Sequence, residues 1–71
     1  MSQPVAPVLP EAIAQSLRAD IVDARLVPGE TLTETAVARR FGVARPTAKV
    51  AIERLVADGL LRREAHRAAR V

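Results

Sequence analysis

The chain has 71 residues and a formal net charge of +3, and nearly half of its residues are apolar although Phe41 is its only aromatic residue. This length allows one small domain, and the apolar content excludes a chain that is disordered by composition. The absence of cysteine excludes disulfides and thiolate metal sites, and no apolar run is long enough to span a membrane.

Residues 1–9 are expected to form a flexible leader, because they are rich in proline and lack the basic start and apolar centre of a signal peptide. The domain itself is expected to span residues 10–71. Its first helix is predicted to run from Pro10, which suits a first helical turn, to about Ala24. The apolar residues of this segment recur at helical spacing, at Ile13, Leu17 and Ile21.

A turn is predicted at residues 28–30, where a rigid proline is followed by a permissive glycine. Thr31–Leu32 is too short to assign and is compatible with a piece of extended chain. Thr33 is predicted to cap a second helix through its hydroxyl group, with Glu34 in the first turn facing the positive end of the helix dipole. Gly42 is expected to end this helix in a left-handed conformation.

A third helix is predicted from about Arg45 to Asp58. Pro46 fits its first turn, because the N–H group that proline lacks has no partner there, and Gly59 follows as a stop signal. An apolar face with helical spacing is formed by Ala48, Ala51, Ile52, Leu55 and Val56.

After Gly59, an extended segment at residues 60–64, a turn at 65–68 and a returning segment at 69–71 predict a small β-hairpin. The alternative is a fraying helix in this arginine- and alanine-rich tail, because the tail contains no Asn-Gly or glycine-rich turn. The resulting fold class is mainly α, with three helices and a small hairpin.

Positive charge is concentrated in the second half of the chain. Residues 44–71 carry seven basic and three acidic side chains, whereas residues 1–43 carry four basic and five acidic ones. This asymmetry indicates a polyanionic partner such as DNA or a membrane surface, and the alternative is an ordinary solvated face. The second and third helices, joined by a short turn that contains glycine, form a helix-turn-helix pattern.

The stretch "VPGETLTETAVARRFGVARPTAKVAIERLVADGLLRRE" resembles the DNA-binding domain of the GntR family of bacterial transcription regulators, in particular its FadR-like branch. The resemblance covers residues 10–71. It implies a winged helix-turn-helix, with the helix-turn-helix at about residues 34–53, and sequence-specific binding of double-stranded DNA in the cytoplasm. The third helix would dock in the major groove, and the wing would contact the minor groove or the backbone.

The resemblance also implies a homodimer on a near-palindromic operator and a separate C-terminal domain that senses a metabolite. That domain would begin near Val71, so the chain is expected to be a fragment, a truncated gene product or an isolated domain. No cofactor is implied.

The chain departs from the family pattern at several positions. Ala44 replaces a serine, which removes a helix cap, and the usual Thr-Pro pair is reversed at residues 46–47. Lys49 replaces an arginine and loses bidentate base recognition. Val50 replaces a glutamate, and Thr35 replaces an arginine. These differences are expected to affect the operator sequence and the affinity rather than the fold.

Six residues are candidates for contacts with DNA: Thr35, Arg45, Thr47, Lys49, His66 and Arg67. Arg45, Thr47 and Lys49 supply polar groups near the start of the third helix, where the alternative is an ordinary exposed face or, for Arg45, a surface salt bridge. Thr35 would either bind a phosphate or cap its helix locally. The resemblance implies that His66 and Arg67 lie at the wing, near the minor groove.

Val50 has two alternative roles. Val50 would either meet a thymine methyl group or pack against the first helix. Arg62 and Arg63 are expected to attract DNA independently of its sequence.

Two other classes of function compete with DNA binding. A winged helix can also serve as a protein-interaction module, with Val50 and the alanine face as its contact surface. An enzyme is disfavoured, because no pair of catalytic groups or metal ligands lies at a useful spacing and His66 is the only histidine.

Overall fold

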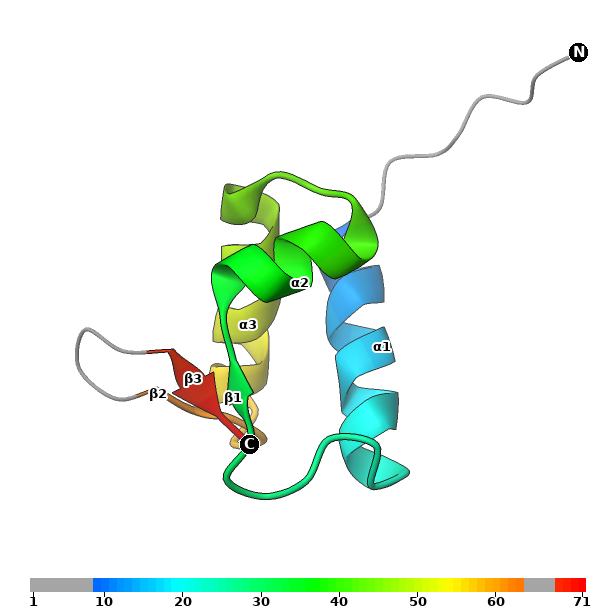
Figure 1. Cartoon of the computed structure of the whole chain (residues 1–71), viewed down its shortest axis with the longest axis vertical. Helices are drawn as coiled ribbons and strands as arrows, with labels where there is room; N and C mark the ends of the chain where they lie inside the picture. Colours follow the sequence, from blue (N-terminus) through cyan, green and yellow to red (C-terminus); the bar gives the residue numbers. More distant parts are fainter. Residues whose placement is uncertain (1–8, 64–67) are drawn as a thin grey trace, which may run out of the picture.

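A computed structural model describes residues 9–63 and 68–71 of the chain. Within these ranges the chain forms three helices, α1 (Pro10–Val22), α2 (Glu34–Phe41) and α3 (Arg45–Ala57). It also forms a three-stranded sheet from β1 (Thr31–Leu32), β2 (Arg62–Arg63) and β3 (Ala69–Arg70). Helix α3 packs against both α1 and α2, and the sheet lies beside the C-terminal half of α3 (Figure 1). The predicted winged-helix fold class is confirmed.

Helix α1 begins as predicted but ends two residues earlier than expected. Proline occupies its first turn, and the helix ends at Val22 rather than at Ala24. The reason is that Ala24 adopts a φ angle of 61°, which terminates the helix in a left-handed conformation that is usual for glycine. The backbone N–H groups of Arg25 and Leu26 then turn back to donate to the carbonyl oxygen of Asp20, at 2.8 and 3.0 Å.

The left-handed residue at the end of α1 leads to a prediction about stability. Because alanine is strained in this conformation, Ala24→Gly is expected to raise the free energy of unfolding by about 0.5–1 kcal/mol, after allowing for the greater entropy of glycine in the unfolded chain. The matched control is Ala19→Gly, at an exposed position inside the same helix, which is expected to lower it by about 1 kcal/mol. Urea denaturation measures both, and a loss of stability in Ala24→Gly would contradict the account.

The ends of α2 and α3 follow the sequence signals. The hydroxyl oxygen of Thr33 accepts a hydrogen bond of 3.0 Å from the backbone N–H of Ala36, which confirms the predicted cap. Gly42 ends α2 with a φ angle of 66°, also as predicted. The residue before α3, Ala44, makes no side-chain cap, and α3 ends at Ala57 with Asp58 as its C-terminal cap.

The sheet has the strand order β1-β3-β2, and both pairs of strands are antiparallel. The predicted return of the chain after Gly59 is confirmed, and the alternative of a fraying helix is wrong. Strand β1, which was too short to assign from the sequence, pairs with β3. Two backbone hydrogen bonds continue this pairing. The N–H of Val71 donates to the carbonyl oxygen of Glu30 at 2.9 Å, and the N–H of Gly29 donates to the carbonyl oxygen of Val71 at 3.1 Å. Residues 64–67, most of the predicted turn, lie outside the described residues.

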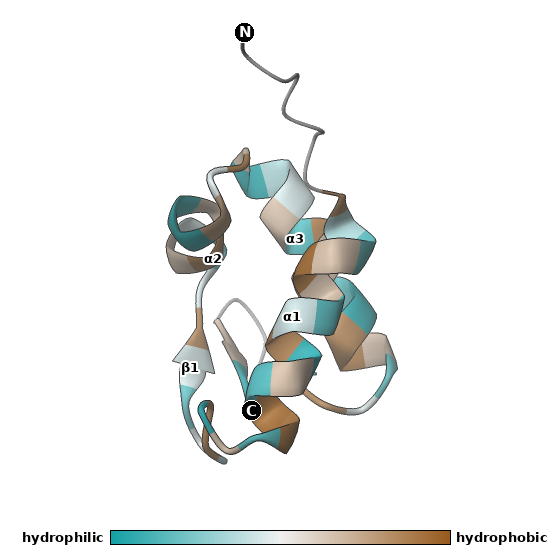
Figure 2. Cartoon of the chain, turned by 90° about the vertical axis from the view of Figure 1, so that its right-hand side faces the viewer, coloured by the Kyte–Doolittle hydropathy of each residue, from teal (hydrophilic) through white to brown (hydrophobic). Residues whose placement is uncertain are grey.

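The core is aliphatic, in keeping with a chain that has a single aromatic residue. The largest fully buried side chains are Ile13 and Leu17 of α1 with Ile52 and Leu55 of α3. Apolar and polar residues alternate along both helices (Figure 2), so each helix turns one apolar face to the interior. Buried residues from α2, from the strands and from the connecting segments complete the core: Leu26, Leu32, Val37, Ala38, Leu61 and Ala69. None of the described helices is long and apolar enough to cross a lipid bilayer.

One buried carboxylate connects α1 to α2. Asp20 is buried, and its two carboxylate oxygens face the guanidinium groups of Arg40, at 2.7 Å, and Arg25, at 3.8 Å. The Arg40 guanidinium also lies over the Phe41 ring, 4.9 Å from its centroid. Since a buried carboxylate needs charged or hydrogen-bonding partners, Arg40 serves the scaffold.

Candidate nucleic-acid interface

Helix α3 presents a polar face to solvent because its other face packs in the core. Ala48, Ala51, Ile52 and Leu55 are buried, which confirms the predicted apolar face apart from the half-buried Val56. Arg45 and Lys49 are exposed and stand four residues apart, so they project from the same side of the helix. The start of α3 therefore carries two cationic side chains on one exposed side.

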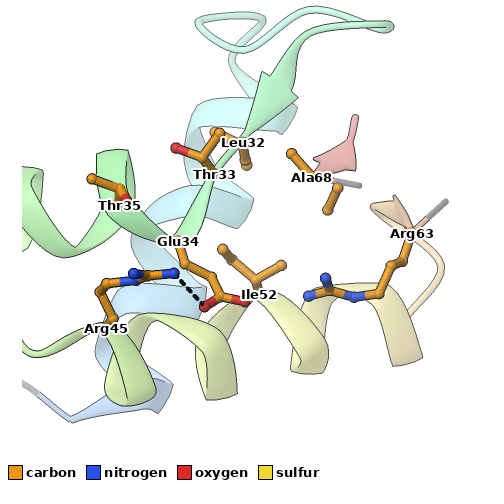
Figure 3. Close-up of a pocket in the computed structure, with 9 residues that line it drawn as sticks. Leu32, Thr33, Glu34, Thr35, Arg45, Ile52, Arg63 and Ala68 are labelled. Carbon is orange, nitrogen blue, oxygen red and sulfur yellow. Dashed lines mark ion pairs between the residues drawn. The ribbon is translucent and has the colours of Figure 1, made fainter. Parts of the chain in front are cut away.

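A groove of about 320 Å³ lies between α2, α3 and the sheet. Its walls bring together Thr35 from the first turn of α2, Arg45 from the first turn of α3 and Arg63 from β2 (Figure 3). These residues lie in three separate elements, so only the packing of the helix-turn-helix against the sheet makes them neighbours. Two of them, Thr35 and Arg45, are sequence-predicted candidates.

The groove also contains a carboxylate that sequence reasoning did not assign to the site. A carboxylate oxygen of Glu34 lies 3.9 Å from a guanidinium nitrogen of Arg45 (Figure 3). The Arg45 side chain is 69% exposed, whereas the Glu34 side chain is only 27% exposed. The acidic group is therefore recessed, and the basic group extends outward from it. Glu34 was predicted only as a dipole partner in the first turn of α2.

Three other residues of α3 do not line this groove. Thr47 is half-buried, and because it follows Arg45 by two residues it points to another side of the helix. Val50 is 47% exposed, so the structure does not bury it against α1. Lys49 is exposed but does not line the groove.

Arg62 and Arg63 are neighbours in β2 but project from opposite sides of the sheet. Residues that face each other across antiparallel strands project from the same side of a sheet. Arg63 is paired with Ala69 and lines the groove, whereas Arg62 is paired with Arg70 on the opposite side. Arg62 and Arg70 line a second hollow of about 310 Å³ beside the Pro28-Gly29 turn. The predicted wing contacts His66 and Arg67 lie outside the described residues.

Ion pairs distinguish the flank between α1 and α3 from the exposed side of α3. On that flank, Arg18 pairs with Asp58, and Arg54 lies 3.6 Å from Glu11. By contrast, the basic residues Lys49, Arg62 and Arg63 form no ion pair with any acidic residue that the structure describes. Unneutralised positive charge therefore gathers at α3 and the sheet.

In residues 9–63 and 68–71, no group of three or more His, Cys, Asp or Glu side chains is arranged to hold a metal ion. What the groove and the exposed side of α3 can do is donate hydrogen bonds and attract anions.

Comparison with known proteins places this geometry in context. Residues 9–71 match the model of the family described as bacterial regulatory proteins, gntR family. A transcriptional regulator of the GntR family from Pseudomonas syringae pv. tomato is 38% identical, with a TM-score of 0.82 over 97% of this chain and 30% of that one. Lar, described as controlling expression of the Listeria monocytogenes agr system and mediating virulence, is 31% identical, with a TM-score of 0.79 over 96% of this chain and 32% of that one. The chain thus spans about a third of the length of these two structures.

Proposed function

We propose that this chain, which belongs to the gntR family of bacterial regulatory proteins, binds double-stranded DNA sequence-specifically as part of a transcription regulator. The observation that carries the proposal is the pair of cationic side chains on the exposed side of α3, next to the groove that Arg63 lines. An α-helix with its side chains is about 10–12 Å wide, which suits the major groove of about 12 Å.

In this arrangement α3 docks in the major groove. Arg45 and Lys49 lie in its first two turns, where a docked helix reaches base edges and phosphates. Arg45 can contact a guanine through two hydrogen bonds, whereas Lys49 presents a single ammonium group. Thr35 would donate its hydroxyl group to a phosphate beside the groove, and Thr47 would reach a phosphate on the other side of α3.

The wing would contact the minor groove or the backbone next to this site. Arg62 and Arg63 on β2 supply positive charge on both sides of the sheet, and His66 and Arg67 follow in sequence. The contacts of His66 and Arg67 with DNA remain predictions. In a longer protein the domain would act as a homodimer on a near-palindromic operator, because two-fold symmetry doubles the contacts.

Salt dependence tests the proposed function. Each neutralised phosphate contributes about −0.9 to the slope of log affinity against log salt, so a footprint of four or five basic side chains predicts a slope between about −3.6 and −4.5. Fluorescence anisotropy with a duplex selected from a random pool measures it, and a scrambled duplex is the control. Absence of binding at low salt, or a slope near zero, would contradict the proposal.

Val50 leads to a prediction about base preference. It is an exposed apolar residue on α3, one residue after Lys49, and we expect it to contact the methyl group of a thymine in the selected duplex. Replacing the contacted thymine by uracil removes one methyl group, which is expected to weaken binding about 4-fold. Val50→Ala is expected to abolish this difference. Equal affinity of the wild type for the two duplexes, at every thymine tested, would exclude the contact.

A protein-interaction module has weaker support. The large apolar residues that are exposed in the described structure are Leu9, Val22, Val27 and Val50. They lie at the start of α1, at its end, in the following loop and on α3. A protein-docking surface depends instead on a contiguous apolar patch.

A further inference from the structure

We propose that Glu34 is a positioning residue that holds the Arg45 guanidinium for reading a base edge, and that it thereby raises the selectivity of DNA binding. This inference rests on the proposed function. It assigns a role to the one acidic side chain among the described residues that line the groove between α2, α3 and the sheet.

In the groove, the Glu34 side chain is recessed, whereas the Arg45 side chain extends outward. Glu34 belongs to the first turn of α2, where a carboxylate is favoured by the helix dipole, directly after the Thr33 cap. Arg45 belongs to the first turn of α3, and their charged groups are 3.9 Å apart. The carboxylate is recessed while most of the Arg45 side chain is exposed. Glu34 can therefore restrain the guanidinium group without covering it.

Restraint matters because an arginine side chain is long and flexible. Ordering a flexible side chain on a base edge costs conformational entropy, and a side chain that is already oriented loses less. In the free protein, water screens the ion pair, so it orients Arg45 only in part. When DNA covers the groove and displaces water, the attraction between Glu34 and Arg45 becomes stronger, so the carboxylate supports the arginine most in the bound state.

The same carboxylate repels phosphates, and this effect does not depend on the DNA sequence. Glu34 is thus expected to lower the affinity for every duplex through its charge, and to raise the affinity for a duplex that Arg45 reads. Only the second effect increases the ratio between specific and non-specific binding. A purely repulsive carboxylate would lower both affinities equally and leave the ratio unchanged.

Glu34→Gln tests the inference, because it removes the charge and keeps the size of the side chain. The control is Glu53→Gln, which removes an exposed carboxylate from α3 that pairs with no described basic residue. We expect Glu34→Gln to weaken binding of the selected duplex by up to about 5-fold, the upper limit for a partly exposed ion pair, and to strengthen binding of the scrambled duplex. Glu53→Gln is expected to strengthen both alike.

A double-mutant cycle separates positioning from a general structural role. In the Arg45→Ala background, Glu34→Gln is expected to leave the selectivity ratio unchanged, because no guanidinium remains to be oriented. If the ratio falls equally in both backgrounds, or if Glu34→Gln raises both affinities as Glu53→Gln does, the inference is wrong. It is also wrong if a new selection with Glu34→Gln changes a base that Arg45→Ala leaves unaffected, since Glu34 would then read DNA directly. Wild-type protein that binds neither duplex refutes the proposed function, and the inference with it.

Discussion

Arg45→Ala is expected to weaken binding of the selected duplex by about 5- to 150-fold, the effect of losing one bidentate contact with a base, which is worth about 1–3 kcal/mol. Binding of a scrambled duplex should fall much less, because the variant loses only one of several positive charges there. The expectation follows from the position of Arg45 in the first turn of α3, with its side chain 69% exposed beside the groove.

Arg54→Ala is the matched control for Arg45→Ala. It removes the same charge from the same helix, but Arg54 lies on the flank where it pairs with Glu11 of α1. Its effect on both duplexes is expected to be small and equal. If Arg45→Ala and Arg54→Ala changed the affinities to the same extent, α3 would not be docked through its first turn.

Leu17→Ala is expected to lower the free energy of unfolding by about 2–5 kcal/mol, the usual cost of a cavity in a close-packed core. Leu17 belongs to α1, and its side chain is fully buried in the core. For a domain of 71 residues, whose total stability is of the order of 4–10 kcal/mol, this loss unfolds a large part of the population at moderate urea concentrations. Urea denaturation followed by circular dichroism measures it.

Val22→Ala is the control for the core prediction, because Val22 lies on the same helix but is 75% exposed. Its effect is expected to stay within about 0.5 kcal/mol. A similar cost for both substitutions would mean that α1 does not pack against α3 through the face that contains Leu17.

Much of the fold could be predicted because its boundaries are set by local chemistry. The Thr33 hydroxyl, the glycine at residue 42 and the proline in α3 each act on the few residues around them, and all three signals were correct. The end of α1 was placed too late, because Ala24 takes a left-handed conformation without the glycine that usually marks it. Strand β1 could not be assigned, because two residues carry no periodicity and their partner, β3, lies far along the chain.

The candidate site was only partly predictable for a similar reason. Arg45 and Thr35 were identified from their places at the starts of two helices, but the ion pair between Glu34 and Arg45 depends on how the turn packs α2 against α3. The division between Arg62 and Arg63 was within reach of the sequence, because neighbouring residues of any strand point to opposite sides. The partial burial of Thr47 could not be predicted from the sequence, because it depends on the packing of α3.

The proposed interface for duplex DNA consists of the exposed side of α3 and the adjacent sheet. Titration of the selected duplex into ¹⁵N-labelled protein, followed by amide chemical shifts, maps this surface directly. The largest shifts are expected at residues 45–50, at Thr35 and at Arg62–Arg63. If the largest shifts instead occur around Glu11, Gln15 and Arg18 of α1, DNA binds to the opposite flank and the account is wrong.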